Sequence, residues 1–171
     1  MKKLSAACAL IIVLVMALMS CAPVDGTATK NKAVALQAFE ALNNGDYDAL
    51  DEFIAPNYKR HCQATPDVAI ESLEQFIAFV KTWEDAMPDM KGEVHYIIAE
   101  GDMVAAYLTY TGTQTGAMGN IPPTGKVMDS KTFVFHRFEN GKIAESWVTW
   151  DNVAILTQLG LFPPPVAGGE E

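Results

Sequence analysis

Asn140 and Gly141 lie between two stretches, residues 127–138 and 142–151, in which apolar and polar side chains alternate. Asn-Gly readily supplies the two positive-φ residues of a tight β-hairpin turn, and alternation is the pattern of a strand with one buried face. The sequence therefore predicts two antiparallel strands joined by a two-residue turn.

An unbroken ladder from this turn determines which side chains share a face of the predicted sheet. It places His136 opposite Glu145, on the face that also carries Trp147 and Asp151. The same face includes Ser130, Thr132, Val134 and Thr149. Because this face combines apolar walls with groups that can move protons, we expect it to line a pocket rather than to face solvent.

The remaining elements follow the order of helices first and strands afterwards. Apolar spacing predicts a helix over 30–43, a short helix after Asp46 and a long helix capped by Ser72, with His61 on a strand or loop between the last two. The expected strands are 91–99, 103–115, 127–138 and 142–151, followed by a helix over 152–159. This order predicts an α+β domain in which one curved, mainly antiparallel sheet wraps around the long helix and encloses a cavity.

The N-terminal residues have the features of a secretory signal over residues 1–20. Two lysines precede an apolar run, residues 4–19, that is too short for a comfortable bilayer span. With Leu18 and Ser20 before Cys21, the segment resembles a bacterial lipoprotein signal. That resemblance implies a lipidated Cys21 and an extracytoplasmic, lipid-anchored protein, at the outer membrane or facing the periplasm. The alternative is a simple secretory signal that is cut near Cys21.

The rest of the chain is expected to divide into a tether over 21–29, a domain over 30–162 and a Pro/Gly-rich tail over 163–171. Once Cys8 and Cys21 are accounted for, Cys62 has no disulfide partner, so the fold depends on an ordinary hydrophobic core. The formal net charge of −9 argues against a nucleic-acid partner and against anionic lipid surfaces. We therefore expect contact with the membrane only through the lipid anchor.

Four stretches of the chain together resemble one known family. They are "APNYKRH", "MPDMKGEV", "EGDMVAAYLTYTGTQTG" followed by "TGK", and "NGKIAESWVTWDN". In this order they are similar to the SnoaL-like polyketide and ester cyclases, which have the nuclear transport factor 2-like fold. The resemblance covers most of the chain after the tether, although Gln114 stands where many relatives have histidine. It implies a cone of N-terminal helices packed on a curved sheet, and a homodimer through the convex sheet face.

The resemblance also implies catalytic roles for two residues. Asp151, after Trp147 on the final strand, matches the aspartate that serves as acid and base in an intramolecular aldol closure, and His61 matches a histidine that lines the same cavity. A carboxylate beside an aromatic ring loses hydration, which raises its pKa and lets it take and return a proton. The alternatives are that Asp151 caps the helix that follows it and that His61 is structural.

Several aromatic and imidazole side chains are candidates for binding a substrate. Trp83 and Trp147 are expected to sandwich a flat ligand, and Tyr58 and Tyr107 to give the same wall a polar edge. His136 is a further candidate, for which a plain cross-strand pair is the competing interpretation. Aromatic residues at such positions are otherwise typical of a core.

No metal-ligand spacing, phosphate-binding glycine loop or hydrolase motif is visible in the sequence, so we expect neither a metal nor a cofactor. The predicted function is that of an aldol-type cyclase, or a related lyase or isomerase, whose partner is a small apolar or aromatic carbonyl compound. Two alternatives stay open. One is a non-catalytic extracytoplasmic binder of an apolar small molecule, and the other is a ketosteroid-isomerase-like enzyme or a dehydratase that uses the same carboxylate.

Overall fold

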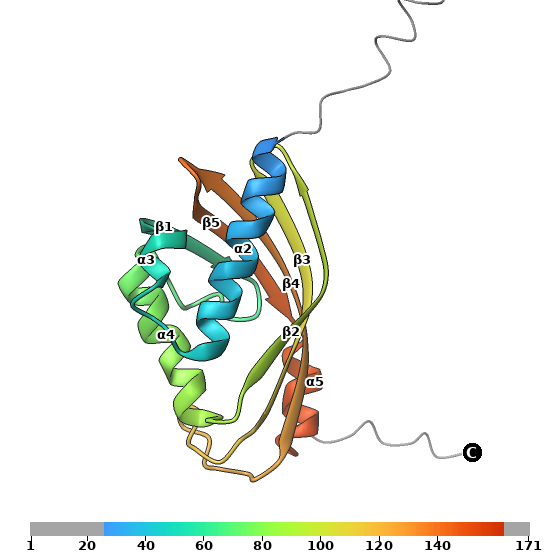
Figure 1. Ribbon diagram of the computed structural model, residues 1–171. Coiled ribbons are helices and arrows are strands. Elements are labelled where there is room, and N and C mark those ends of the chain that lie inside the picture. Colours follow the sequence, from blue (N-terminus) through green and yellow to red (C-terminus); the bar gives the residue numbers. More distant parts are fainter. Residues whose placement is uncertain (1–25, 163–171) are drawn as a thin grey trace, which may run out of the picture.

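The structure, a computed structural model, describes residues 26–162, and most of its elements follow the predicted order, with β1 between α3 and α4 at the place where a strand or loop was expected (Figure 1). The elements are α2 (Gly26–Asn44), α3 (Leu50–Phe53), β1 (Ile54–Cys62), α4 (Leu73–Ala86), β2 (Lys91–Glu100), β3 (Met103–Thr113), β4 (Val127–Glu139), β5 (Lys142–Trp150) and α5 (Asn152–Gln158). The α+β class is confirmed. The predicted signal segment, Cys21 and the tail over 163–171 lie outside the described residues, so lipidation stays a prediction.

The strands form one sheet in the order β1-β5-β4-β3-β2. β1 pairs with β5 in parallel, and the other neighbours are antiparallel. Helices α2, α3 and α4 lie on one face of the curved sheet (Figure 1), which we call the helix-covered face, and α5 packs against β4. The opposite face, which we call the open face, carries exposed side chains. Among residues 26–162, no helix combines the length and the apolar character needed to cross a membrane.

The hairpin between β4 and β5 begins as predicted and then changes register. Asn140 and Gly141 have φ angles of 52° and 78°, as a tight turn requires. Phe138 pairs with Ile143, but the next pair is Arg137 with Glu145, so Ala144 is the extra residue of a β-bulge.

The prediction of an unbroken ladder is therefore wrong, and so is the predicted pairing of His136 with Glu145. His136 pairs with Ser146. The physical reason is that the bulge lets two consecutive apolar residues, Ile143 and Ala144, both remain buried, at 2% and 7% exposure. Beyond the bulge every side chain of β5 points to the face opposite to the one predicted.

The helices also begin at identifiable residues. Ser72 Oγ accepts a hydrogen bond from Gln75 N at 3.1 Å and so caps α4, as predicted, while Gln75 Oε1 accepts one from Glu71 N at 2.7 Å. α2 begins at Gly26 rather than at the expected Lys30.

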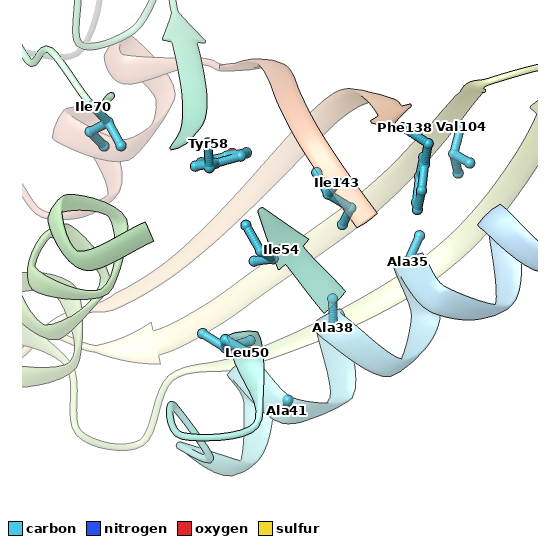
Figure 2. Packing of buried hydrophobic residues seen from close by; sticks show 10 residues of the cluster. All are labelled: Ala35, Ala38, Ala41, Leu50, Ile54, Tyr58, Ile70, Val104, Phe138 and Ile143. Carbon is cyan, nitrogen blue, oxygen red and sulfur yellow. The ribbon is translucent and has the colours of Figure 1, made fainter. Parts of the chain in front are cut away.

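The buried residues of α2 are small and occur along one side of the helix. They are Ala28, Asn31, Ala35, Ala38 and Ala41. Small side chains let α2 approach the sheet closely, and Figure 2 shows Ala35 and Ala38 pointing toward the main buried cluster, to which Ala41 also belongs. The other members of this cluster are Leu50, Ile54, Tyr58, Ile70, Val104, Phe138 and Ile143. A second cluster, near α5, contains Ala86, Met87, Met128, Ile155 and Leu159.

Candidate functional site

A cavity of about 190 Å³, partly open to solvent, lies between the helices and the helix-covered face of the sheet. Members of both buried clusters line it, so most of its wall is apolar. Its polar groups come from four strands and one helix. They are Asn43, Tyr58, Arg60, Tyr110, Ser130, Thr132, His136 and Ser146. An apolar hollow with a few convergent polar groups is the usual form of a small-molecule site.

His136 and Ser146 form the central polar contact of this cavity. They are cross-strand partners because of the bulge at Ala144, and His136 Nδ1 lies 2.7 Å from Ser146 Oγ. Burial lowers the pKa of His136 from 6.5 to about 4, because the imidazolium would lose its hydration. The ring is therefore neutral at pH 7.

Tyr58 lies next to this pair on β1. Burial raises the pKa of Tyr58 to about 12, and a hydrogen bond with Ser146 and the nearby charge of Arg60 act in the opposite direction. Tyr110, also on the cavity wall, has its pKa raised to about 12 by burial, again against the charge of Arg60. Both phenols therefore keep their protons at neutral pH and can donate hydrogen bonds.

Aromatic rings surround the guanidinium of Arg60. Its Cζ atom lies 4.6 Å from the ring centroid of Phe79 and 5.4 Å from that of Trp150. Trp150 in turn contacts Trp83 edge to face, with the ring centroids 6.0 Å apart and the planes at 88°. Contacts of this kind stabilise a guanidinium that lies above an aromatic ring.

Three of the predicted substrate-binding residues, Tyr58, Trp83 and His136, line the cavity. Trp147, which was expected beside them, instead lies on the open face, because the bulge reverses the direction of its side chain. Tyr107 is on the open face as well, where its ring is 4.7 Å from that of Phe133. The predicted positions of Trp147 and Tyr107 in the cavity wall are therefore wrong.

His61 also lies away from the cavity. Its ring stacks on Trp147 with centroids 5.4 Å apart, and its Nε2 is 2.8 Å from Glu145 Oε1. Glu145 Oε2 accepts a further hydrogen bond from Arg137 Nε at 3.0 Å. The hydrogen bond with His61, and next the one with Arg137, lowers the pKa of Glu145. These residues form a surface ion-pair network beside an open groove of about 670 Å³, which His61 and Trp147 help to line.

Asp151 is the N-cap of α5. Its Oδ1 accepts a hydrogen bond from Ala154 N at 3.0 Å, its side chain is exposed, and it lines neither the cavity nor the open groove. The expectation that Asp151 projects into an aromatic chamber is therefore wrong. Trp150 takes the inward position and the chain turns into α5 at the next residue. An acid/base role for Asp151 therefore stays only as the alternative to a base on the cavity wall.

Sequence reasoning missed Arg60, Tyr110, Ser146 and Trp150. For Ser146 and Trp150 a signal was present, since the consecutive apolar residues Ile143 and Ala144 interrupt the alternation and mark a bulge. Arg60 follows Tyr58 at the two-residue spacing of a strand, which places both side chains on one face. Among residues 26–162, no group of three or more His, Cys, Asp or Glu side chains is placed to hold a metal ion.

The sequence profile that describes SnoaL-like polyketide cyclases matches residues 33–159. Among solved structures, IdmH of Streptomyces antibioticus, a proposed polyketide cyclase, is 30% identical, and the match covers 76% of this chain and 98% of IdmH with a TM-score of 0.68. AclR of Streptomyces galilaeus, a proposed hydroxylase, is 27% identical, with 80% and 99% covered and a TM-score of 0.70.

A SnoaL-like structure from Jannaschia sp. shares the fold, with a TM-score of 0.74 at 24% identity over 84% of this chain and 100% of its own. A search of curated proteins finds no match. Relatives with similar sequence identity to this chain thus differ in the reaction proposed for them. The reaction of this chain has to be inferred from the residues that line its cavity.

Proposed function

The chain belongs to the SnoaL-like polyketide cyclase family, and from this membership we propose that it catalyses an acid/base reaction, without a cofactor, on a small activated carbonyl compound held in the cavity between the helices and the sheet. The observation that carries the proposal is the hydrogen bond of 2.7 Å between His136 and Ser146 inside that cavity. We assign the proton transfer to His136, because the cavity lining includes no carboxylate among the described residues.

His136 has the properties of a base for an activated carbon acid. A ring whose pKa is about 4 is no stronger a base than an ordinary carboxylate, but it is unprotonated at pH 7 and ready to accept a proton. The α-proton of a doubly activated carbonyl compound is acidic enough for such a base. A bound substrate that develops negative charge beside the ring would also raise the pKa of His136 during the reaction.

Ser146 and Tyr58 complete the proposed arrangement. If His136 Nδ1–H donates to Ser146 Oγ, then Nε2 is the bare nitrogen that accepts the substrate proton, and the Ser146 hydroxyl can donate toward Tyr58. The Tyr58 hydroxyl, which stays protonated, can then donate to the substrate oxygen on which the enolate charge develops. Returning the proton from the imidazolium to an alkoxide would complete an aldol-type ring closure, and returning it to carbon would complete an isomerisation.

Exchange of α-protons for deuterium tests this assignment without knowledge of the natural substrate. We suggest 2-tetralone, a flat carbonyl compound, as the probe in D₂O, with exchange followed by proton NMR. Loss of a positioned general base typically costs about 10²-fold or more in rate, so His136→Gln is expected to reduce the protein-dependent exchange by that factor. Asp151→Asn serves as the control and is expected to keep the wild-type rate.

The opposite pattern of exchange rates would support Asp151, rather than His136, as the group that transfers the proton. Unchanged exchange in His136→Gln, together with a loss in Asp151→Asn, would contradict the assignment to His136 and support Asp151 as the acid and base. Binding of the probe with no exchange above background would favour the non-catalytic binder instead.

A further inference from the structure

Arg60 is a buried cation on the wall of the cavity. The residue is only 7% exposed, and its Nη1 is buried without a hydrogen-bond partner. An arginine keeps its charge at every physiological pH, so it cannot escape the cost of burial by losing a proton. Its charge acts inside the cavity, since it lowers the pKa of both Tyr58 and Tyr110 against the effect of burial.

The charge of Arg60 is not balanced by an acidic side chain. Among the ion pairs between described residues, none includes Arg60, and the described residues that line the cavity include neither aspartate nor glutamate. Buried charges in proteins are normally paired, because an unpaired one is strongly unfavourable. This arginine therefore differs from the chain's surface cations such as Arg137, which pairs with Glu145 and Glu139.

The neighbouring aromatic rings explain part of how the charge of Arg60 can be buried without an acidic partner. The faces of Phe79 and Trp150 attract the guanidinium and make its burial tolerable. A ring face does not replace an oxygen acceptor for an N–H bond, however, and Nη1 stays unpaired. Guanidinium groups present their N–H bonds as a planar fork that matches the two oxygens of a carboxylate.

We propose that Arg60 is the carboxylate-binding residue of the cavity, and that the substrate is a small, flat carbonyl compound that also carries a carboxylate group. The second part rests on the proposed function, since it takes the ligand of the cavity to be the substrate. The first part concerns binding alone. The aromatic pair Trp83 and Trp150 contacts the apolar body of such a ligand, and Arg60 binds its acidic end.

Benzoate and benzamide test this inference, because they have nearly the same shape and differ in charge. A cavity of about 190 Å³ has room for either probe, since an apolar cavity of about 150 Å³ can hold benzene. Dissociation constants measured by isothermal titration calorimetry, at constant ionic strength set with chloride, are expected to favour benzoate by about tenfold to a hundredfold. Equal binding of the two compounds, or binding of neither, overturns the inference.

Two variants identify the residue responsible for the preference. Arg60→Gln is expected to abolish the preference for benzoate, and Arg60→Lys, which keeps the charge but not the fork, to retain part of it. Arg137→Gln removes an arginine from the open face and is expected to keep the wild-type preference. A preference that persists in Arg60→Gln overturns the inference, and Arg60→Lys provides the same comparison should the glutamine variant fail to fold.

The same measurements separate this inference from the proposed function. His136→Gln is expected to lose α-proton exchange while it still binds benzoate more tightly than benzamide. Should wild-type protein prefer benzoate without catalysing any exchange, the acid/base proposal fails and the assignment of Arg60 stands. Should exchange depend on His136 while the two probes bind equally, the assignment of Arg60 fails and the acid/base proposal stands.

Discussion

His136 and Arg60 give the cavity two basic side chains with different responses to burial. Burial in an apolar wall removes the charge of His136 at neutral pH, whereas Arg60 stays charged because a guanidinium is not deprotonated in proteins. The cavity therefore combines one permanent cation, suited to binding an anion, with one neutral base, suited to accepting a proton.

The buried imidazole predicts how the stability of the protein depends on pH. Because the folded-state pKa of His136 is lowered to about 4 from 6.5, the unfolded chain binds this proton first as the pH falls. The full stability is present above pH 6.5 and is lost toward pH 4, by about 2–3 kcal/mol at pH 4.5. Urea unfolding measures the free energy of unfolding at pH 7 and at pH 4.5. The decrease between the two pH values should be about 2–3 kcal/mol smaller in His136→Gln than in the wild type. Equal losses in the two proteins would contradict the burial of a neutral ring.

The connection between β3 and β4 shows how one buried side chain can organise a loop. Gln114 is fully buried, its Nε2 donates to the carbonyl oxygens of Gly116 and Pro122, and its Oε1 accepts from the amide and the hydroxyl of Thr124. The amides of Thr115 and Gly116 donate to Ala86 O at the end of α4. The loop is thus tied to the helix that carries Trp83.

Truncation of this side chain is expected to destabilise the domain. Gln114→Ala leaves several buried loop groups without partners, and the free energy of unfolding should fall by about 2–3 kcal/mol. Chemical denaturation measures the change. Gln63→Ala, at an exposed position, is the matched control and should change the stability by less than about 0.5 kcal/mol. A Gln114 variant as stable as the control would show that the loop does not depend on these hydrogen bonds.

The whole molecule has two sheet faces of different character. The helix-covered face lines the cavity, while the open face exposes large apolar side chains on several strands. They are Tyr96, Ile98, Phe133, Phe135 and Trp147, between 40% and 72% exposed. Contiguous exposed apolar surface of this kind commonly marks a protein interface.

We predict that the open face is the interface of a homodimer. The paired substitutions Phe133→Lys and Phe135→Lys place two like charges on that face and should convert the dimer into a monomer, as measured by size-exclusion chromatography with light scattering. Val153→Lys alters an exposed apolar residue of α5 instead and should leave the dimer intact. A wild-type protein that is monomeric at micromolar concentration would refute the prediction.

Much of the fold could be predicted from the sequence because its signals are local. The Asn140–Gly141 turn, the Ser72 cap and the alternation of the strands each depend on residues that are close neighbours in the chain. The boundaries of the four strands predicted after the long helix accordingly agree with the structure to within two residues, whereas β1 was expected only as a strand or loop. The main misjudged boundary was the start of α2, where small and polar residues carry no strong helical pattern.

The site was predicted less well, because which face a strand presents is decided by distant partners. A single extra residue, Ala144, turned Trp147 outward and brought Ser146 and Trp150 inward, since burying both Ile143 and Ala144 outweighs a regular ladder. The sequence by itself determined the helices, the four later strands and their order, and it gave Tyr58, Trp83 and His136 as candidates that do line the cavity. Only the tertiary structure decided that Arg60 joins them and that Asp151 does not, because burial depends on packing between segments far apart in the chain.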